Sequence, residues 1–389
     1  MATMTAEERL ALIKENLEEI LNPEIIESIL KEGRSPKIYW GTATTGRPHC
    51  GYFVPAIKIA QLLAAGCEMT ILLADIHGFL DNLKAPLELV EKRALFYKQS
   101  ITAILQAVGV STDKLKFVFG SEYQKRSDYV MDVYRMCSLI SEHDAKRAGA
   151  EIVKQTDNAP LSGLLYPILQ VLDEQYLDVD AQFGGKSLTI LGLDQRKLFI
   201  AAKDWLPKLG YREIMLFTDV RLDSKIDLLD PPDVVAKKIK KAEAAPGVTE
   251  GNGILAFVEY VLLPAAGLKG KREFIVKRER DGLEPLVYTE ISKIHDDYKN
   301  DILTPQLIKP AITESLQALL APIQAAFAAS PEWQDITAKA YPPEEKKKEK
   351  KVKNKGTRYP GGGAPPAAGG EALPVRLADG VAPTDKPAA

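Results

Sequence analysis

One ordered alternation of apolar runs and helical patterns constrains the fold more than any other feature of this chain. The run "KIYWG" (37–41) is followed by a turn and by a helical pattern ending near Gly66, and "EMTILLAD" (68–75) is then almost continuously apolar. A second helical pattern follows Pro86, and "LKFVFG" (115–120) supplies a third short strand. Continuous apolar runs are typical of strands buried on both faces of a parallel sheet. With right-handed crossovers, this βαβαβ order predicts an α/β fold, a Rossmann-like doubly wound parallel sheet with ligands at the carboxyl ends of its strands.

The character of the chain changes twice beyond this region. From about residue 225 helical patterns dominate, interrupted by a hairpin-like pair, "REFIVKRER" and "LEPLVYTEI". From residue 343 the chain is first rich in Lys and Glu and then in Pro, Gly and Ala, and such segments bury too little apolar surface to offset their ordering entropy. We therefore expect N-terminal helices at 1–35, an α/β domain at 36–224 with an insertion near 124–155, a helical domain at 225–342 and a disordered basic tail at 343–389.

Composition excludes several classes of protein. The 389 residues are 46% hydrophobic, which is enough for two domains with cores. The sequence contains no run of 18 apolar residues, the length needed to span a membrane. The N-terminal sequence is acidic and amphipathic without the layout of a signal peptide, so we expect a cytoplasmic protein with no membrane partner. Three cysteines without a CxxC pair indicate neither a disulfide framework nor a zinc site, and we expect no protein-bound metal. A net charge of −2 means that any nucleic acid would be met by a local basic patch.

The segment "TATTGRPHCGY" (42–52) lies at the junction of the first strand and the first helix, where a nucleotide site is expected. His49 just inside a helix start, with Gly51 two residues on, allows a triphosphate to meet the imidazole and the helix amides. Gly51 also has no Cβ to obstruct a flat base. The alternative is that Gly46 and Pro48 simply make the turn and that His49 is an exposed loop residue.

A second cluster lies in "LLYPILQVLDEQYLDVDAQFGG" (164–185). On a helix, Tyr166, Gln170 and Asp173 share one face, because they are four and three residues apart. They are interleaved with leucines and an isoleucine that belong in a core, and polar groups near a core require partners. A small zwitterionic substrate fits, with the amide and phenol at its ammonium group and Asp173 with Tyr39 at a hydroxyl at its far end. The alternative is a helix with a mixed face.

Several longer segments, taken in order, resemble one known family. "KIYWGTATTGRPHCGYFVP", "LLADIHGFLDNLKAP", "RAGAEIVKQ", "LSGLLYPILQ" and "VDAQFGG" together resemble tyrosyl-tRNA synthetase of the eukaryotic and archaeal type, a class I aminoacyl-tRNA synthetase. The similarity runs from roughly Leu10 to Tyr341. It implies an enzyme that joins L-tyrosine to ATP, releases pyrophosphate and transfers the tyrosyl group to the 3′ end of tRNA(Tyr). It also implies a homodimer, Mg²⁺, and a helical domain at 225–342 that reads the anticodon.

The resemblance assigns roles to individual residues. Segment 44–52 corresponds to the HIGH-type signature of the family, with His49 and Gly51 catalytic and at the ATP, and with Thr44 and Tyr52 in the same ATP site. Tyr52 stands where many class I enzymes have a second histidine. The tyrosine site is implied to comprise Tyr39 and Asp173 at the substrate hydroxyl, and Tyr166, Gln170 and Gln195 at its amino group. A site that hydrogen-bonds the phenol rejects phenylalanine strongly, so no editing domain is required.

Two departures from the family pattern bear on activity. The family runs almost directly from "AQFGG" to "DQRK", whereas here "KSLTILGL" (186–193) is interposed, an apolar insert able to displace Gln195. A mobile KMSKS-type loop should follow "GYREIM", but the chain continues "LFTDVRLDSKIDLLD" and the loop is missing, with Arg221 and Lys225 as nearby cations. Lysines aimed at the leaving pyrophosphate stabilise the transition state. We therefore expect this chain to activate tyrosine poorly or not at all.

Three interpretations follow from these departures. The first is an active ligase in which Arg221 and Lys225 replace the loop. The second is a catalytically impaired protein that binds tyrosine and tRNA. The third is a mis-spliced gene model, since both departures resemble shifted splice boundaries beside text that otherwise matches the family.

Two groups of basic residues are candidates for tRNA contacts. Lys146 and Arg147 lie in a segment that resembles the dimer and acceptor-stem region of the family. A further group lies in the helical pattern "PPDVVAKKIKKAEAA" and comprises Lys237, Lys238, Lys240 and Lys241. A solvated helix face, phosphate contacts to RNA and a nuclear-import signal at 237–241 are all compatible with the second group.

Overall fold

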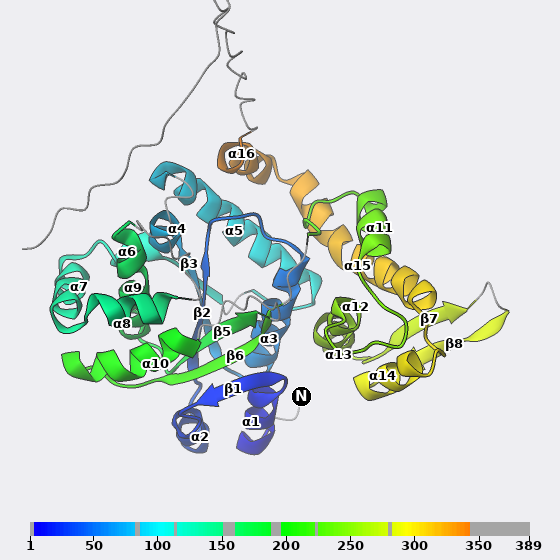
Figure 1. Cartoon of the computed structure of the whole chain (residues 1–389), viewed down its shortest axis with the longest axis horizontal. Helices are drawn as coiled ribbons and strands as arrows, with labels where there is room; N and C mark the ends of the chain where they lie inside the picture. Colours follow the sequence, from blue (N-terminus) through cyan, green and yellow to red (C-terminus); the bar gives the residue numbers. More distant parts are fainter. Residues whose placement is uncertain are drawn as a thin grey trace, which may run out of the picture. The chain divides into compact units, whose positions relative to one another are not determined.

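The computed structural model has a mixed α/β architecture around one large sheet (Figure 1). It describes residues 4–81, 86–112, 115–150, 160–187, 196–221, 225–278 and 282–342. The strands of the sheet within these residues are β1 (Leu17–Leu21), β2 (Lys37–Ala43), β3 (Glu68–Ala74), β4 (Leu115–Phe119), β5 (Ala181–Ser187) and β6 (Met215–Arg221). Their order is β1-β6-β5-β2-β3-β4. The five strands β2 to β6 are mutually parallel and β1 pairs antiparallel with β6, so the predicted doubly wound parallel sheet is confirmed.

Helices connect the strands and cover both faces of the sheet. They are α1 (Ala6–Lys14), α2 (Glu24–Lys31), η1 (Cys50–Tyr52), α3 (Phe53–Ala64), α4 (Asp75–Leu80), α5 (Leu87–Ala107), α6 (Gly120–Tyr123), α7 (Ser127–Leu139), α8 (Glu142–Gly149), α9 (Ser162–Tyr176), α10 (Arg196–Trp205) and η2 (Leu206–Leu209). Alternation along each strand divides the core between the two faces. Trp40 of β2 and the residues of α3 and α5 belong to one buried cluster, whereas Tyr39 and the residues of α9 and α10 belong to the other.

The N-terminal residues depart from the helical expectation. α1 begins with a capping box, in which the Thr5 hydroxyl accepts from the Glu8 amide and the Glu8 carboxylate accepts from the Thr5 amide. After α1, Asn16 adopts a left-handed conformation with φ of 57°, and Leu17–Leu21 then forms β1. The predicted N-terminal helices are present as α1 and α2, but the segment between them is a strand, because pairing with the edge of β6 outweighs its helical pattern.

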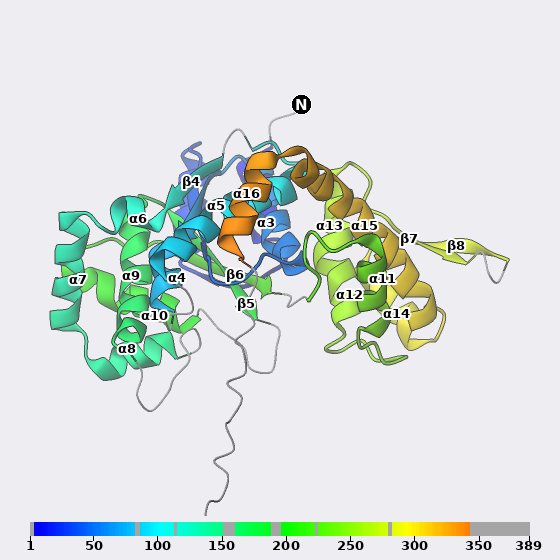
Figure 2. The same cartoon turned by 90° about the horizontal axis from the view of Figure 1, so that it is seen from above.

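The described residues from 225 to 342 are mainly helical and lie beside the sheet (Figure 2). Its elements are α11 (Pro232–Lys241), α12 (Gly253–Phe257), η3 (Val258–Leu262), α13 (Leu263–Leu268), β7 (Phe274–Arg278), β8 (Leu283–Tyr288), α14 (Ile291–Lys299), α15 (Pro305–Ala329) and α16 (Pro331–Ala340). The expected hairpin is present as the antiparallel pair of β7 and β8. α16 packs against α5, and the core cluster on the α3 and α5 face continues into α12, α14 and α15.

The domain boundaries at 35/36 and 224/225 remain a prediction, since residues up to 342 form one contact unit. The expected tail at 343–389 lies outside the described residues. In the described part of the chain, no helix combines the length and apolar character required to cross a membrane.

Candidate active site

The order of the parallel strands determines where a ligand is expected. β2 and β5 are neighbours, with β3 and β4 on one side of the pair and β6 on the other. The connection after β2 covers one face of the sheet with α3, and the long connection before β5 covers the other face with α9. In doubly wound sheets, ligands bind outside the carboxyl ends of the strands at this switch point. The turn after β2 lies at this edge.

Contacts from α5 and from the end of α16 hold the carbonyl groups of that turn. Arg93 Nη1 donates to the Thr45 carbonyl at 2.5 Å, and the Tyr341 hydroxyl donates to the Gly46 carbonyl at 2.5 Å. The Arg93 guanidinium also lies 5.2 Å from the centre of the Tyr341 ring. The turn is therefore fixed by residues far from it in sequence.

The segment after β6 fixes the other side of the same turn. The Arg47 guanidinium pairs with Asp227 at 2.9 Å, and the Cys50 amide donates to the Ile226 carbonyl at 2.9 Å. The backbones of His49 and Asp227 form an isolated antiparallel bridge. The segment that follows β6 thus contacts the signature turn directly.

The predicted nucleotide residues divide into two kinds. His49 caps η1, and its Nδ1 accepts the Gly51 amide hydrogen at 3.1 Å, which leaves the ring proton on Nε2 as a donor. Thr44, by contrast, is fully buried, and its hydroxyl donates to the Val90 carbonyl at 3.4 Å. The hydroxyl of Tyr52 lies 3.0 Å from that of Thr42. His49 therefore carries its ring N–H on Nε2, and the hydroxyls of Thr44 and Tyr52 have protein partners.

Asp173 is the centre of a second group of polar residues, on the face of the sheet covered by α9. Its side chain is completely buried. Its Oδ1 accepts from Gln124 Nε2 at 2.8 Å and from the Tyr129 hydroxyl at 2.9 Å, and its Oδ2 lies 3.7 Å from His77 Nε2. Burial raises the pKa of Asp173 to about 7, against the lowering effect of its hydrogen bonds, and burial lowers the pKa of His77 to about 3. At neutral pH the histidine is therefore neutral and the carboxyl group is balanced between its two forms.

Several buried polar atoms around Asp173 have no hydrogen-bond partner among the described residues. They are the hydroxyls of Tyr39 and Tyr123, His77 Nε2, Gln124 Oε1, Gln182 Oε1 and Asp173 Oδ2. Tyr39 and Gln182 are paired in register on β2 and β5, so their side chains leave the same face of the sheet. The charges of Glu174 and Asp173 reinforce the effect of burial in raising the pKa of Tyr39. Unpaired buried polar atoms are costly, and their concentration here fits a site for a small polar ligand.

Of the other predicted tyrosine-site residues, the structure describes two and leaves one outside the described residues. Tyr166 is buried, and its ring meets that of His77 edge-on with centroids 4.7 Å apart. Gln170 is half-buried between Tyr166 and Asp173 along α9. Gln195 lies outside the described residues. Tyr166 and Asp173 thus both lie against His77, to which the sequence analysis assigns no site role.

Gln124 and Tyr129 were also missed by the sequence interpretation. Gln124 follows the short helix α6, and its side chain lies against Gly120, where an added Cβ would be 2.7 Å from Gln124 Oε1. The Asp75 carboxylate accepts from both the amide and the hydroxyl of Ser121 and so holds the start of this helix. The sequence offered one signal, the polar stretch "SEYQ" directly after the third predicted strand, at the edge where ligands bind.

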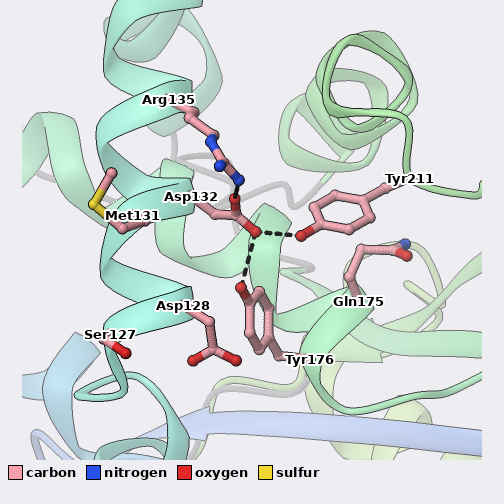
Figure 3. A pocket seen from close by; sticks show the side chains of 8 residues that line it. All are labelled: Ser127, Asp128, Met131, Asp132, Arg135, Gln175, Tyr176 and Tyr211. Carbon is pink, nitrogen blue, oxygen red and sulfur yellow. Dashed lines mark hydrogen bonds and ion pairs between the residues drawn. The ribbon is translucent and has the colours of Figure 1, made fainter.

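A cavity of about 620 Å³ is lined in part by Tyr176, Tyr211 and Asp132 (Figure 3). At its centre the buried Asp132 carboxylate accepts from the hydroxyls of Tyr176 and Tyr211 and from Arg135. These hydrogen bonds outweigh the effect of burial and lower the pKa of Asp132. The Tyr176 ring also packs against Tyr129 with centroids 4.7 Å apart. The cluster therefore supports the wall behind Asp173.

The candidate tRNA residues are partly engaged within the chain. Lys146 and Arg147 pair with Glu142 and Asp144 on their own helix. On α11, Lys237 pairs with Asp233 and Lys238 with Asp230, whereas Lys240 and Lys241 are exposed. Exposed intrahelical pairs are weak and exchange readily for phosphate contacts.

The two departures that the sequence analysis predicts, at 186–193 and after "GYREIM", stay predictions and fall largely outside the described residues. Lys186 and Ser187 extend β5 and pair with Val220 and Arg221 of β6, whereas 188–195 and 222–224 are not described. Within the described residues, no group of three or more His, Cys, Asp and Glu side chains is arranged to hold a metal ion.

A family model described as "tRNA synthetases class I (W and Y)" matches residues 31–321. The chain belongs to this family. The cytoplasmic tyrosine–tRNA ligase of Saccharomyces cerevisiae is 46% identical over 381 residues, which cover 92% of this chain and 95% of the yeast protein. The corresponding protein of Danio rerio is 47% identical over 356 residues, which cover 88% of this chain but 65% of the fish protein. Within the family, the predicted tyrosyl-tRNA synthetase membership is confirmed.

A solved structure agrees with this placement. The tyrosyl-tRNA synthetase of Archaeoglobus fulgidus, complexed with L-tyrosine, superposes with a TM-score of 0.74 and 31% identity, covering 83% of this chain and 99% of that one. The confirmed membership rests on most of the described chain, including the turn after β2 and α9.

Proposed function

We propose that this protein is a tyrosine–tRNA ligase of the cytoplasm, which activates L-tyrosine with ATP and transfers it to the 3′ end of tRNA(Tyr). The observation that carries the proposal is Oδ2 of buried Asp173, which has no hydrogen-bond partner among the described residues and lies among other such polar atoms at the expected edge of the sheet. The close similarity to cytoplasmic tyrosine–tRNA ligases supports it.

The tyrosine side chain would enter between β2 and α9. Asp173 Oδ2 accepts the hydrogen of the substrate phenol, and the Tyr39 hydroxyl contacts the oxygen of that phenol. Phenylalanine would leave these groups buried and unpaired, which explains how one site discriminates between the two amino acids. At the other end, Tyr166, Gln170 and Gln195 hold the substrate ammonium group.

ATP would lie against the turn after β2. The Nε2 proton of His49 points to its phosphates, and the backbone at Gly51 leaves room for the nucleotide. The carboxylate of tyrosine attacks the α-phosphorus, the bond to the bridging oxygen breaks, and pyrophosphate leaves. Mg²⁺ is proposed to arrive with the phosphates and to neutralise charge on them, since this ion is usually held by substrate phosphates and few protein ligands.

The missing KMSKS-type loop is expected to slow activation. Only the residues "LFTDVRLD" stand between "GYREIM" and "SKIDLLD", and this stretch has Arg221 as its single cation. Arg221 and Lys225 are the candidates to act on the leaving pyrophosphate. The impaired variant and the mis-spliced gene model remain alternatives to a fully active ligase, and the insert at 186–193 belongs to the same question.

A homodimer is supported by an apolar surface on α7. Met131, Tyr134 and Leu139 of this helix are 49%, 61% and 48% exposed, a group of large side chains suited to a second copy. Transfer RNA would contact Lys146 and Arg147 and the basic residues of α11, with the anticodon at the helical region 225–342. A nuclear-import role for 237–241 stays a prediction without structural support.

Tyrosine-dependent exchange of pyrophosphate into ATP tests the proposed function, followed by charging of tRNA(Tyr). We expect slow exchange with L-tyrosine and none with L-phenylalanine or L-tryptophan. Exchange at the rate typical of a synthetase would refute the expectation of slow activation but support the ligase. Binding of neither L-tyrosine nor ATP by the purified chain would contradict the proposed function itself.

A further inference from the structure

The imidazole of His49 is restrained from two directions. On one side, its Nδ1 accepts the Gly51 amide hydrogen at 3.1 Å. On the other, the Tyr52 ring meets it edge-on, with centroids 5.5 Å apart and planes at 82°. The first contact is a local feature of η1 and sets the tautomer. The second depends on where the Tyr52 ring is held.

Tyr52 is itself anchored to the sheet. Its hydroxyl lies 3.0 Å from that of Thr42, and the Thr42 side chain is 9% exposed. The Tyr52 ring also makes edge contacts with Trp40 and Tyr97, at centroid distances of 6.1 and 5.9 Å. These contacts hold the ring against the α3 and α5 face of the sheet. The Thr42 contact occupies one hydrogen-bonding position of the Tyr52 hydroxyl.

The strand that carries Thr42 is a rigid support. β2 is paired on both sides, with β3 and with β5, and Thr42 stands opposite Leu73 in the parallel ladder with β3. A site held by packed strands is positioned more accurately than one held by a loop. Thr42 lies only seven positions before His49 in sequence, and the Tyr52 ring links its hydroxyl to the His49 imidazole.

We propose that the hydroxyl pair of Thr42 and Tyr52 is a positioning device for His49, and that Tyr52 acts through His49 and not by contacting the phosphates. This inference rests on the proposed function, in which His49 meets the triphosphate of ATP. It deepens that function by assigning a role to Thr42. It also gives Tyr52 an indirect role, through the His49 ring, in place of the direct contact with ATP that its position in the signature implies. The consequence is that loss of either hydroxyl weakens nucleotide binding while tyrosine binding is retained.

The test measures the dissociation constants of α,β-methylene-ATP with Mg²⁺ and of L-tyrosine by calorimetry on the full chain. The non-reacting nucleotide keeps the measurement independent of how fast the chain activates tyrosine. Thr42→Val and Tyr52→Phe each remove one hydroxyl with little change of shape, and the double variant closes a mutant cycle. Thr42→Ser removes the methyl group of Thr42 and keeps a hydroxyl at this position. Thr102→Val is the control, because that hydroxyl bonds only to its own helix at Lys98 on the surface.

Each single variant is expected to raise the nucleotide dissociation constant about fivefold, the effect of losing one hydrogen bond. The double variant should be no worse than either single one, Thr42→Ser should recover most of the affinity, and tyrosine affinity should stay within about twofold, which also shows that the variants are folded. Nucleotide affinity unchanged in both single variants, additive losses in the double variant, or an equal loss of tyrosine affinity would each overturn the positioning role. If the unaltered chain binds tyrosine but no nucleotide, the proposed ATP site fails and the inference fails with it. If the unaltered chain binds nucleotide and the variants bind it equally well, the positioning role fails and the proposed ATP site stands.

Discussion

Replacing Tyr129 by phenylalanine should change the pH dependence of tyrosine binding. The Tyr129 hydroxyl donates to Asp173 Oδ1 at 2.9 Å and is one of the hydrogen bonds that favour the charged carboxylate. Burial opposes these bonds and raises the pKa of Asp173 to about 7. Without the hydroxyl, the carboxylate keeps the Gln124 bond at 2.8 Å and loses one of its two partners on that oxygen. The pKa of Asp173 should therefore rise further.

The size of the effect follows from the strength of a hydrogen bond to a charged group. Such a bond contributes about 1.5 to 3 kcal/mol, and about 1.4 kcal/mol moves a pKa by one, so the pKa of Asp173 should rise from about 7 to about 8 or 9 in the variant. In the proposed site the carboxylate is the form that accepts the substrate phenol, so the affinity for L-tyrosine should fall as the pH drops below this pKa. At pH 7 the variant should bind L-tyrosine about tenfold more weakly than the unaltered chain, and at pH 8.5 the difference should narrow.

Calorimetric titration with L-tyrosine between pH 6 and 8.5 provides the assay. Tyr176→Phe is the matched control, because its hydroxyl donates to Asp132 while its ring packs against Tyr129. We expect the pH midpoint of binding to move upward for Tyr129→Phe and to stay in place for Tyr176→Phe. Coincident pH profiles for Tyr129→Phe and the unaltered chain, or equal shifts in both variants, would refute the assignment of Asp173 as the titrating acceptor.

Two further substitutions test the supports of the site. Gly120→Ala would place a Cβ 2.7 Å from Gln124 Oε1, so the Gln124 side chain must move. We expect the affinity for L-tyrosine to fall about tenfold in this variant. Gly253→Ala is the control, because its added Cβ meets nothing within 4 Å, and it should leave the affinity for L-tyrosine unchanged in the same titration. Asp132→Asn weakens the acceptor of three hydrogen bonds and should lower the free energy of unfolding by about 1 to 3 kcal/mol at pH 7, measured by urea denaturation. Because folding lowers the pKa of Asp132, its contribution is present above about pH 4 and lost as pH falls, so the variant and the unaltered chain should converge in acid. A difference that persists unchanged at pH 3 would contradict this reading of Asp132.

The sequence predicted the parallel sheet because its strands are apolar on both faces and its turns are marked by glycine and proline. It could not predict β1, since "LEEIL" becomes a strand only through pairing with β6, almost 200 residues later. Local periodicity does not report such long-range pairing. The same limit applies to Thr44, whose position in the signature indicated ATP but whose hydroxyl bonds to α5.

The residues of the candidate site also fall into those that local spacing could group and those that only long-range contacts bring together. Tyr166, Gln170 and Asp173 could be grouped from sequence because helix spacing alone puts them on one face. His77, Gln124 and Tyr129 could not, because each reaches Asp173 from an element at least 44 residues away, and only the strand order brings those elements together. The resemblance to a family supplied roles for the first group and gave no signal for the second.

The central claim is that the unpaired oxygen of Asp173 receives the phenol of tyrosine. The ratio of dissociation constants for L-phenylalanine and L-tyrosine, measured for the unaltered chain and for Asp173→Ala, tests it most directly. The account predicts a preference for tyrosine of about a thousandfold or more in the unaltered chain and its collapse to about tenfold or less in the variant. A variant that keeps the full preference, or an unaltered chain that binds both amino acids equally, would contradict it.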